Sequence, residues 1–187
     1  MKPLLSAFVL VWLLLSACGG SGGSGSVSAA GVSVRVPEGW KSLTTKTGLT
    51  IAFDAADLKS EAPSYPRVKV ETSTASDPTL EQVLKAVPGS QIKARAERIS
   101  VVEDPAEATV GGMKAVTIAV KADIGDQSIT TRHVIVAIGG ASAVSFQLEA
   151  PSDQWEAQKE VLASILSSVS FDPKKLPPPG VNPASQR

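Results

Sequence analysis

Three glycine-containing turns constrain the fold of this chain more than any other feature. They are Gly111-Gly112, Gly125-Asp126 and Gly139-Gly140. Such pairs accept the positive φ angles of tight hairpins, so they favour short connections between antiparallel strands. The segments that they separate are rich in Val, Ile and Thr and span residues 113–122, 127–138 and 142–149. The pattern predicts an antiparallel meander in the second half of the chain.

Further strands are predicted in the first half of the domain. An apolar side chain at every second position is typical of a strand that buries one face. Phe53 falls on the buried face of one such strand, whereas Arg67 and Glu71 fall on the charged outer face of another. A loop with two prolines is expected over residues 56–66. The predicted strands span residues 32–36, 49–54, 67–72 and, with less regular alternation, 93–104.

Two amphipathic helices complete the predicted elements. Asp77 is a good N-cap, and a proline–glycine pair ends a helix over residues 77–87. A second helix opens at Pro151-Ser152-Asp153 and extends to Val169, with Trp155 on its apolar side. Packing both apolar stripes on the strands predicts an α+β fold. We expect a single antiparallel sheet of about six to eight strands with two main helices packed on it.

The N-terminus has the features of a secretory leader. Residues 1–17 contain one basic side chain, Lys2, followed by a largely apolar run from Leu4 to Leu15. This run is too short for a bilayer-spanning helix, which needs about 20 apolar residues. We therefore expect a signal peptide over residues 1–17.

The sequence Leu15-Ser16-Ala17-Cys18 resembles the lipobox of bacterial lipoproteins. Leu15 occupies a position where an ordinary signal-peptidase site has a small residue. In such lipoproteins the cysteine sulfur receives a diacylglyceryl group, and cleavage between the residues corresponding to Ala17 and Cys18 leaves the cysteine first, with or without an added N-acyl chain. Cys18 is the only cysteine of the chain. The alternative is a chance cysteine after a signal peptide.

Lipid on Cys18 would tether the domain to the extracytoplasmic face of the cell membrane. Two acyl chains anchor a protein stably, whereas one binds only marginally. Residues 19–26 are only Gly and Ser, and such a coil typically spans roughly 15 Å. We assign residues 18–30 to the lipidated cysteine and a flexible linker.

A single domain is expected over residues 31–172. With Cys18 modified no disulfide can form, so the apolar core must stabilise the fold alone. A domain of this size can bury roughly two-thirds of its unfolded surface. Residues 173–187 are rich in proline and predict an extended tail; recognition of this tail by a partner is the alternative.

The charge balance argues against nucleic acid as a partner. The chain has 18 basic and 18 acidic residues, and removal of Lys2 with the leader leaves 17 against 18, a net charge of −1. A near-neutral domain is poorly suited to nucleic acid or to an anionic membrane surface.

The order of these elements resembles the PsbP-like domain. Pro37-Glu38-Gly39-Trp40 follows the first strand, and Gly111-Gly112 precedes Met113-Lys114-Ala115 at the start of the meander. The actinobacterial branch of this family includes LpqN-type lipoproteins. The likeness covers about residues 31–172, together with the lipobox and linker. It implies an antiparallel sheet with helices on its faces and a non-catalytic role in assembly or interaction, and it supplies no catalytic residues.

Trp40 and Tyr65 are the candidate ligand contacts. Both flank loops, and their rings are large enough to stack on a ligand. Trp155 lies on the apolar helix stripe and is expected in the core. No glycine pair is followed by a helix with Lys-Ser or Lys-Thr, so the sequence contains no phosphate-binding loop, and no cofactor is predicted.

His133 is the only histidine and is expected to be structural. It lacks the partners of a structural zinc site, and the chain has no Gly-x-Ser-x-Gly motif for a hydrolase. Glu103, Asp104 and Glu107 form a group of carboxylates that could bind a hard cation. Their spacing matches no calcium loop, so we interpret them as solvated turn residues.

These observations predict a non-enzymatic binding or protein-interaction module of the bacterial envelope. Its partner would be an envelope protein or an apolar small molecule. The scarcity of His, Cys and clustered polar residues argues against the first alternative, an envelope hydrolase with an unrecognised site. The second alternative is a surface antigen without a specific ligand.

Overall fold

The computed structural model describes residues 25–73, 98–138 and 143–176. They form a three-stranded sheet in the order β1-β2-β10 and a seven-stranded sheet in the order β3-β4-β5-β9-β8-β7-β6, with antiparallel pairing throughout. The small sheet contains β1 (Ser26–Ala29), β2 (Val32–Arg35) and β10 (Ser170–Phe171). The large sheet contains β3 (Lys41–Thr44), β4 (Gly48–Ala52), β5 (Arg67–Ser73), β6 (Arg98–Val110), β7 (Met113–Ile124), β8 (Gln127–Ala137) and β9 (Ala143–Pro151).

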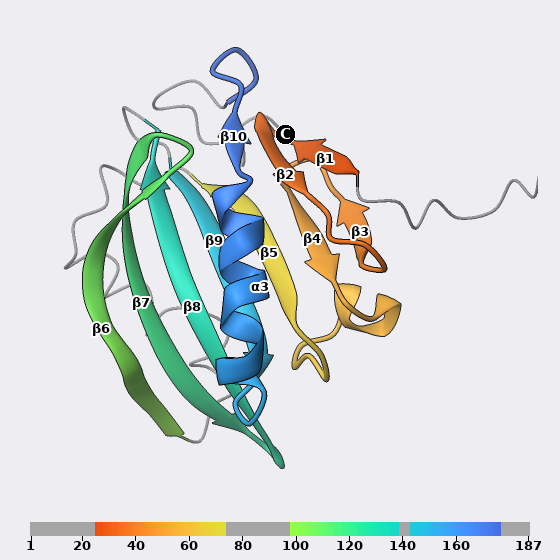
Figure 1. Cartoon of the computed structure of the whole chain (residues 1–187), viewed down its shortest axis with the longest axis vertical. Helices are drawn as coiled ribbons and strands as arrows, with labels where there is room; N and C mark the ends of the chain where they lie inside the picture. Colours follow the sequence, from red (N-terminus) through yellow and green to blue (C-terminus); the bar gives the residue numbers. More distant parts are fainter. Residues whose placement is uncertain (1–24, 74–97, 139–142, 177–187) are drawn as a thin grey trace, which may run out of the picture.

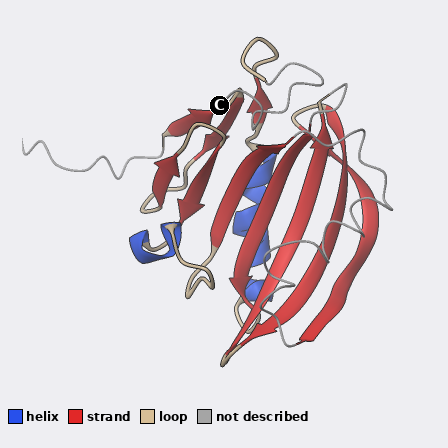
Figure 2. Cartoon of the chain, turned by 180° about the vertical axis from the view of Figure 1, so that it is seen from behind, coloured by secondary structure: helices blue, strands red, loops and turns tan. Residues whose placement is uncertain are grey.

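Helices are a minor part of the described chain. It contains one α-helix, α3 (Trp155–Ser167), and one 3-10 helix, η1 (Ala55–Leu58). Figure 1 shows α3 along one face of the large sheet, and Figure 2 shows the opposite face of that sheet. The helix predicted over residues 77–87 lies outside the described residues. Among the helices that are described, none is long and apolar enough to cross a bilayer.

The prediction of a single sheet with two main helices is wrong, because the structure is mostly β and has two sheets. The chain changes sheet between β2 and β3. Pro37 has no backbone N–H to continue a ladder, and Gly39 turns the chain with a φ of 81°. Alternation identifies which face of a strand is buried, but not the strand with which it pairs. The structure also places β1 at residues that we had assigned to the linker.

The predicted meander is confirmed. Strands β6, β7, β8 and β9 follow one another in the chain and pair in that order. Gly111, Gly112 and Gly125 have φ angles of 55°, 81° and 58° in the connecting turns. The third predicted turn, at residues 139–140, lies outside the described residues. β5 pairs with the free edge of β9 and thereby joins the meander to β4 and β3.

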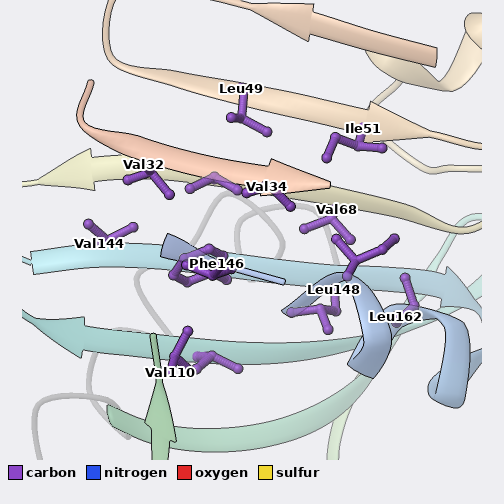
Figure 3. Close-up of a cluster of buried hydrophobic side chains, with 14 of the residues drawn as sticks. Val32, Val34, Leu49, Ile51, Val68, Val110, Val144, Phe146, Leu148 and Leu162 are labelled. Carbon is purple, nitrogen blue, oxygen red and sulfur yellow. The ribbon is translucent and has the colours of Figure 1, made fainter. Parts of the chain in front are cut away.

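The main core lies between the small sheet, α3 and one face of the large sheet. Phe146 and Leu148 of β9 are completely buried there, together with Leu162 of α3. Figure 3 shows side chains from β2, β4, β5 and β9 converging on this region. Complete burial of one such side chain contributes about 1.5–3 kcal/mol. The alternation seen in the sequence therefore selects the correct buried face for these strands.

The opposite face of the large sheet carries a second apolar cluster. Its buried members are Val116, Ile118 and Val120 of β7, with Ile99 and Ile135 packed against them. They alternate along β7 with Ala115 and Ala119, which belong to the main core. β7 is therefore buried on both faces.

The segment after α3 closes the small sheet. Asp172 donates its backbone N–H to the carbonyl oxygen of Gly31 over 2.8 Å. A Cβ on Gly31 would lie 2.6 Å from the backbone nitrogen of Leu176, and the ring of Phe171 would lie 2.8 Å from a Cβ on Gly111. These two glycines permit the close approach. Residues 173–176, which we had assigned to the extended tail, thus pack against the domain.

Candidate functional site

A buried arginine connects the large sheet to the loop before β5. Arg67 is 0% exposed and lies opposite Glu149 in the β5–β9 ladder. Its Nε donates a hydrogen bond to Oε2 of Glu149, whose side chain is also buried. The Lys69 Nζ atom is 3.8 Å from the same carboxylate oxygen. The sequence had placed Arg67 on an outer, solvated face, and this prediction is wrong.

The remaining nitrogen atoms of Arg67 bind the backbone of the loop. Nη1 donates to the carbonyl oxygens of Asp57, at 2.9 Å, and of Ser60, and Nη2 donates to that of Glu61 at 3.2 Å. Burying a guanidinium costs free energy unless its donors are satisfied, and here one carboxylate and three carbonyl groups satisfy them. Arg67 therefore fixes the loop against the end of the sheet.

Asp57 fixes the other half of the same loop. Its carboxylate is buried and accepts hydrogen bonds from the backbone N–H groups of Ser64, at 3.0 Å, and Tyr65, at 2.8 Å. Hydrogen bonds to an ionised acceptor are about twice as strong as neutral ones. The loop is consequently held from both ends, and the position of the Tyr65 backbone is fixed.

Three aromatic side chains form a row beside this loop. The Trp40 and Phe53 ring centroids are 6.1 Å apart in an edge-to-face arrangement, and those of Phe53 and Tyr65 are 5.5 Å apart. Trp40 is 8% exposed, Phe53 53% and Tyr65 43%. We call these three residues the aromatic row. The structure thus brings the two candidate ligand contacts to one place, but only Tyr65 offers a large accessible surface.

Phe53 links the row, although the sequence had placed it on a buried strand face. That prediction is wrong because β4 ends at Ala52. Beyond the end of the strand, the Phe53 N–H still bonds the Pro66 carbonyl oxygen at 3.0 Å, but alternation no longer determines which side chain is buried. Phe53 was therefore missed as a site residue.

A cleft of about 540 Å³ with both polar and apolar lining adjoins the same loop. Pro63 and Ser64 line one side of it, next in sequence to Tyr65. The β7–β8 turn and the segment between β9 and α3 supply the remaining walls, with Lys121, Gln127 and Asp153 among the polar side chains. Positively charged, negatively charged and neutral polar side chains line the cleft. The cleft is therefore suited to noncovalent binding of a polar or amphipathic group.

His133 is buried in β8 and is not among the residues that line this cleft. It is 6% exposed, and its Nε2 has no hydrogen-bond partner in the described part of the chain. Burial lowers the pKa of His133, and the nearby Glu149 carboxylate opposes this effect only in part. The imidazole is therefore neutral at pH 7. No group of three or more His, Cys, Asp or Glu residues suited to a metal ion occurs among the described residues.

The three clustered carboxylates belong to a strand and not to a turn. Glu103, Asp104 and Glu107 lie in β6, which accommodates them and Pro105 through register shifts after Val101 and after Glu103. Glu103 binds Arg132 through contacts of 2.6–2.9 Å. Our interpretation of all three as turn residues is therefore wrong, although Asp104 and Glu107 are exposed to solvent.

Trp155 is buried, as predicted, and anchors the start of α3. It is 5% exposed, and the guanidinium carbon of Arg132 lies 5.4 Å from its ring centroid. The residues proposed for signal cleavage and lipidation, Ala17 and Cys18, lie outside the described residues.

The fold is similar to several solved structures. The solution structure of cyanobacterial PsbP (CyanoP) from Synechocystis sp. PCC 6803 matches with a TM-score of 0.56 and 17% identity, over 84% of this chain and 99% of that one. LpqN of Mycobacterium tuberculosis, described as involved in cell envelope biogenesis, matches with a TM-score of 0.55 and 19% identity, over 76% and 83% of the two chains.

A third similar structure comes from a eukaryote. The Saccharomyces cerevisiae Ran-binding protein Mog1p matches with a TM-score of 0.55 and 12% identity, over 79% of this chain and 94% of that one. No family model and no curated protein sequence matches the chain. These likenesses show that the chain has a PsbP-like fold, as the resemblance in the sequence had implied.

Proposed function

We propose that this protein is a lipid-anchored module of the bacterial envelope that binds a partner noncovalently and catalyses no reaction. The observation that carries the proposal is the fixed loop over residues 57–66, whose residues Pro63 and Ser64 line the cleft. A surface held by Arg67 and Asp57 loses little conformational freedom on binding, which favours recognition. The partner is an envelope protein or an apolar small molecule carrying a polar group.

The fold comparison supports a binding role. Mog1p is described as a Ran-binding protein and LpqN as a protein of envelope biogenesis. The single histidine, His133, is buried, and its Nε2 has no hydrogen-bond partner among the described residues, so no described hydroxyl is bonded to that nitrogen. We therefore favour binding over hydrolysis.

Site-specific photo-crosslinking in cells tests the cleft. A photoreactive side chain at Gln127, which is exposed and lines the cleft, should capture a discrete partner in the full-length protein. The matched control is Lys114, which is also exposed but lies at the other end of β7. Equal capture at both positions, or capture at neither, would contradict a binding role for the cleft.

The anchor is tested separately. The mature protein should partition into detergent, and its N-terminal peptide should carry a diacylglyceryl group on Cys18 by mass spectrometry. Cys18→Ser should release the protein from the membrane fraction or leave the leader uncleaved. An unmodified sulfur on a membrane-free wild-type protein would refute the lipid anchor.

A further inference from the structure

The aromatic row has a large apolar surface that the fold leaves open. Among the described residues, the exposed large hydrophobic side chains are Phe53, Tyr65, Val101 and Val102. Phe53 and Tyr65 lie in ring contact, so together they form one continuous aromatic surface. Aromatic rings at such positions favour the boundary between water and hydrocarbon, because the ring is apolar and a Tyr hydroxyl stays hydrated.

The N-terminal end of the described chain lies close to this surface. The Gly25 carbonyl oxygen accepts a hydrogen bond of 2.7 Å from the N–H of Val36. Val36 is four residues from Trp40, a separation that spans at most about 14 Å. Trp40 in turn contacts Phe53. Figure 1 shows the start of β1 on the same side of the molecule as β3 and η1, which flank the row.

The chain between Cys18 and Gly25 limits the distance to a bilayer. Seven residues, 19–25, could span at most about 25 Å if fully extended, and a Gly/Ser coil of this length typically spans about 15 Å. A lipid on Cys18 would therefore hold the aromatic row within reach of the lipid headgroups. A short tether raises the effective concentration of the surface to the millimolar range, at which a weak contact becomes populated.

The charges around the row favour a contact that depends on the rings and not on anionic lipid. Lys41 and Lys59 are exposed on the flanking segments. Glu38 and Glu61 are exposed there as well, so opposite charges are interspersed. A mixed surface gives little net attraction to an anionic leaflet.

We propose that Phe53 and Tyr65 insert into the headgroup region of the bilayer that holds Cys18. Trp40 supports Phe53 from the protein side. The contact would orient the domain so that the fixed loop faces the membrane and the start of β1 lies beside that loop. This inference rests on the proposed lipid anchor, because without the tether two rings provide too little affinity for stable binding.

Spin-label depth measurements on the lipidated full-length protein in phosphatidylcholine vesicles test the inference. Cys18 is the only cysteine of the chain, and in the lipidated protein its sulfur is blocked. Ser64→Cys therefore introduces a single free thiol, and this thiol is next in sequence to Tyr65. The ratio of oxygen to nickel-chelate accessibility should be several-fold higher for a label at Ser64→Cys than for a control label at Lys114→Cys. Replacing both rings, with Phe53→Ser and Tyr65→Ser, should reduce the ratio to the control value.

The outcomes separate this inference from the anchor. A vesicle-bound protein whose Ser64→Cys label behaves like the Lys114→Cys label would overturn the ring contact and leave the anchor intact. A protein that does not co-float with vesicles would refute the anchor. A label that is immobilised but shielded from oxygen would show that protein, and not lipid, covers the rings, which also overturns the inference. Phe53→Trp should preserve the high ratio, since Trp favours the same interface.

Discussion

The main core and the loop over residues 57–66 are held together by opposite kinds of interaction. Around Phe146 and Leu148, stability comes from apolar side chains that are completely buried. In the loop, it comes from Arg67 and Asp57, two buried charged residues that bind mainly backbone groups. Apolar packing is nondirectional and tolerates variation, whereas the buried charges require each partner in its place. The comparison suggests that the core supports the fold and that the charged network shapes the surface used for binding.

Phe146→Ala tests the first half of this comparison and should have the largest effect on stability. It removes a fully buried aromatic ring and leaves a cavity, so the free energy of unfolding should fall by about 3–5 kcal/mol. Urea denaturation measures the change. Phe53→Ala is the matched control, because Phe53 is 53% exposed. This variant should lower the free energy of unfolding much less. Similar losses for both variants would contradict the assigned roles.

Arg67→Met tests the second half of the comparison. It leaves the buried Glu149 carboxylate without its main partner, so the free energy of unfolding should fall by about 3 kcal/mol. Adding Glu149→Leu should restore most of the global stability, because an apolar pair can replace a buried ion pair.

The loop should respond differently from the whole domain in that double variant. Its carbonyl groups at Asp57, Ser60 and Glu61 would still lack the guanidinium donors. Amide hydrogen exchange over residues 57–66 should therefore remain faster than in the wild type, even where the urea midpoint recovers. Wild-type exchange in the loop would show that Arg67 does not position it.

His133 makes the stability of the sheet dependent on pH. Burial lowers its pKa in the folded state below the ordinary value of 6.5, so the unfolded state binds more protons as the pH falls through that value. The contribution of His133 to the free energy of unfolding is therefore fully present above about pH 6.5. On acidification the free energy of unfolding falls, by at most about 1.4 kcal/mol per pH unit for one proton. Urea midpoints at several pH values should show this slope, and His133→Leu should reduce it. An unchanged slope would assign the pH dependence to other groups.

Of the interactions considered, the Arg132–Glu103 ion pair should contribute least to the free energy of unfolding. Both side chains are partly exposed, at 22% and 35%, so solvent screens their attraction. We expect a coupling of about 0.2–1 kcal/mol from a double-mutant cycle with Arg132→Met and Glu103→Gln. Arg132→Met also removes the contact with Trp155, and the cycle separates that loss from the ion pair. A coupling above about 2 kcal/mol would place this pair with the buried network of Arg67.

Sequence reasoning was most successful where a pattern repeats. The glycine turns and the alternating Val, Ile and Thr residues predicted the meander of β7 to β9, and the apolar stripe with Trp155 predicted α3. It failed just beyond the end of β4 and at the register shifts within β6. Phe53 continues the alternation of β4 but lies just beyond it, and Glu103 was interpreted as a turn residue although a bulged edge strand contains it.

The candidate site could be predicted only in part. Trp40 and Tyr65 were selected for ring size and for their place beside loops, and the structure brings them to one row. Nothing in a single sequence distinguishes Arg67 from Lys69, since both alternate with the apolar residues of β5. The difference arises because the loop before β5 folds over Arg67 and leaves Lys69 26% exposed.

By itself, the sequence determined which side chains in most strands are buried and where the chain turns back on itself, because periodicity and glycine act over a few residues. It also carries the predicted lipid anchor at Cys18. Only the tertiary structure decided that the strands divide into two sheets, that Arg67 is buried, and that Phe53 joins Trp40 to Tyr65. These features depend on contacts between segments far apart in the chain, whose formation no local pattern records.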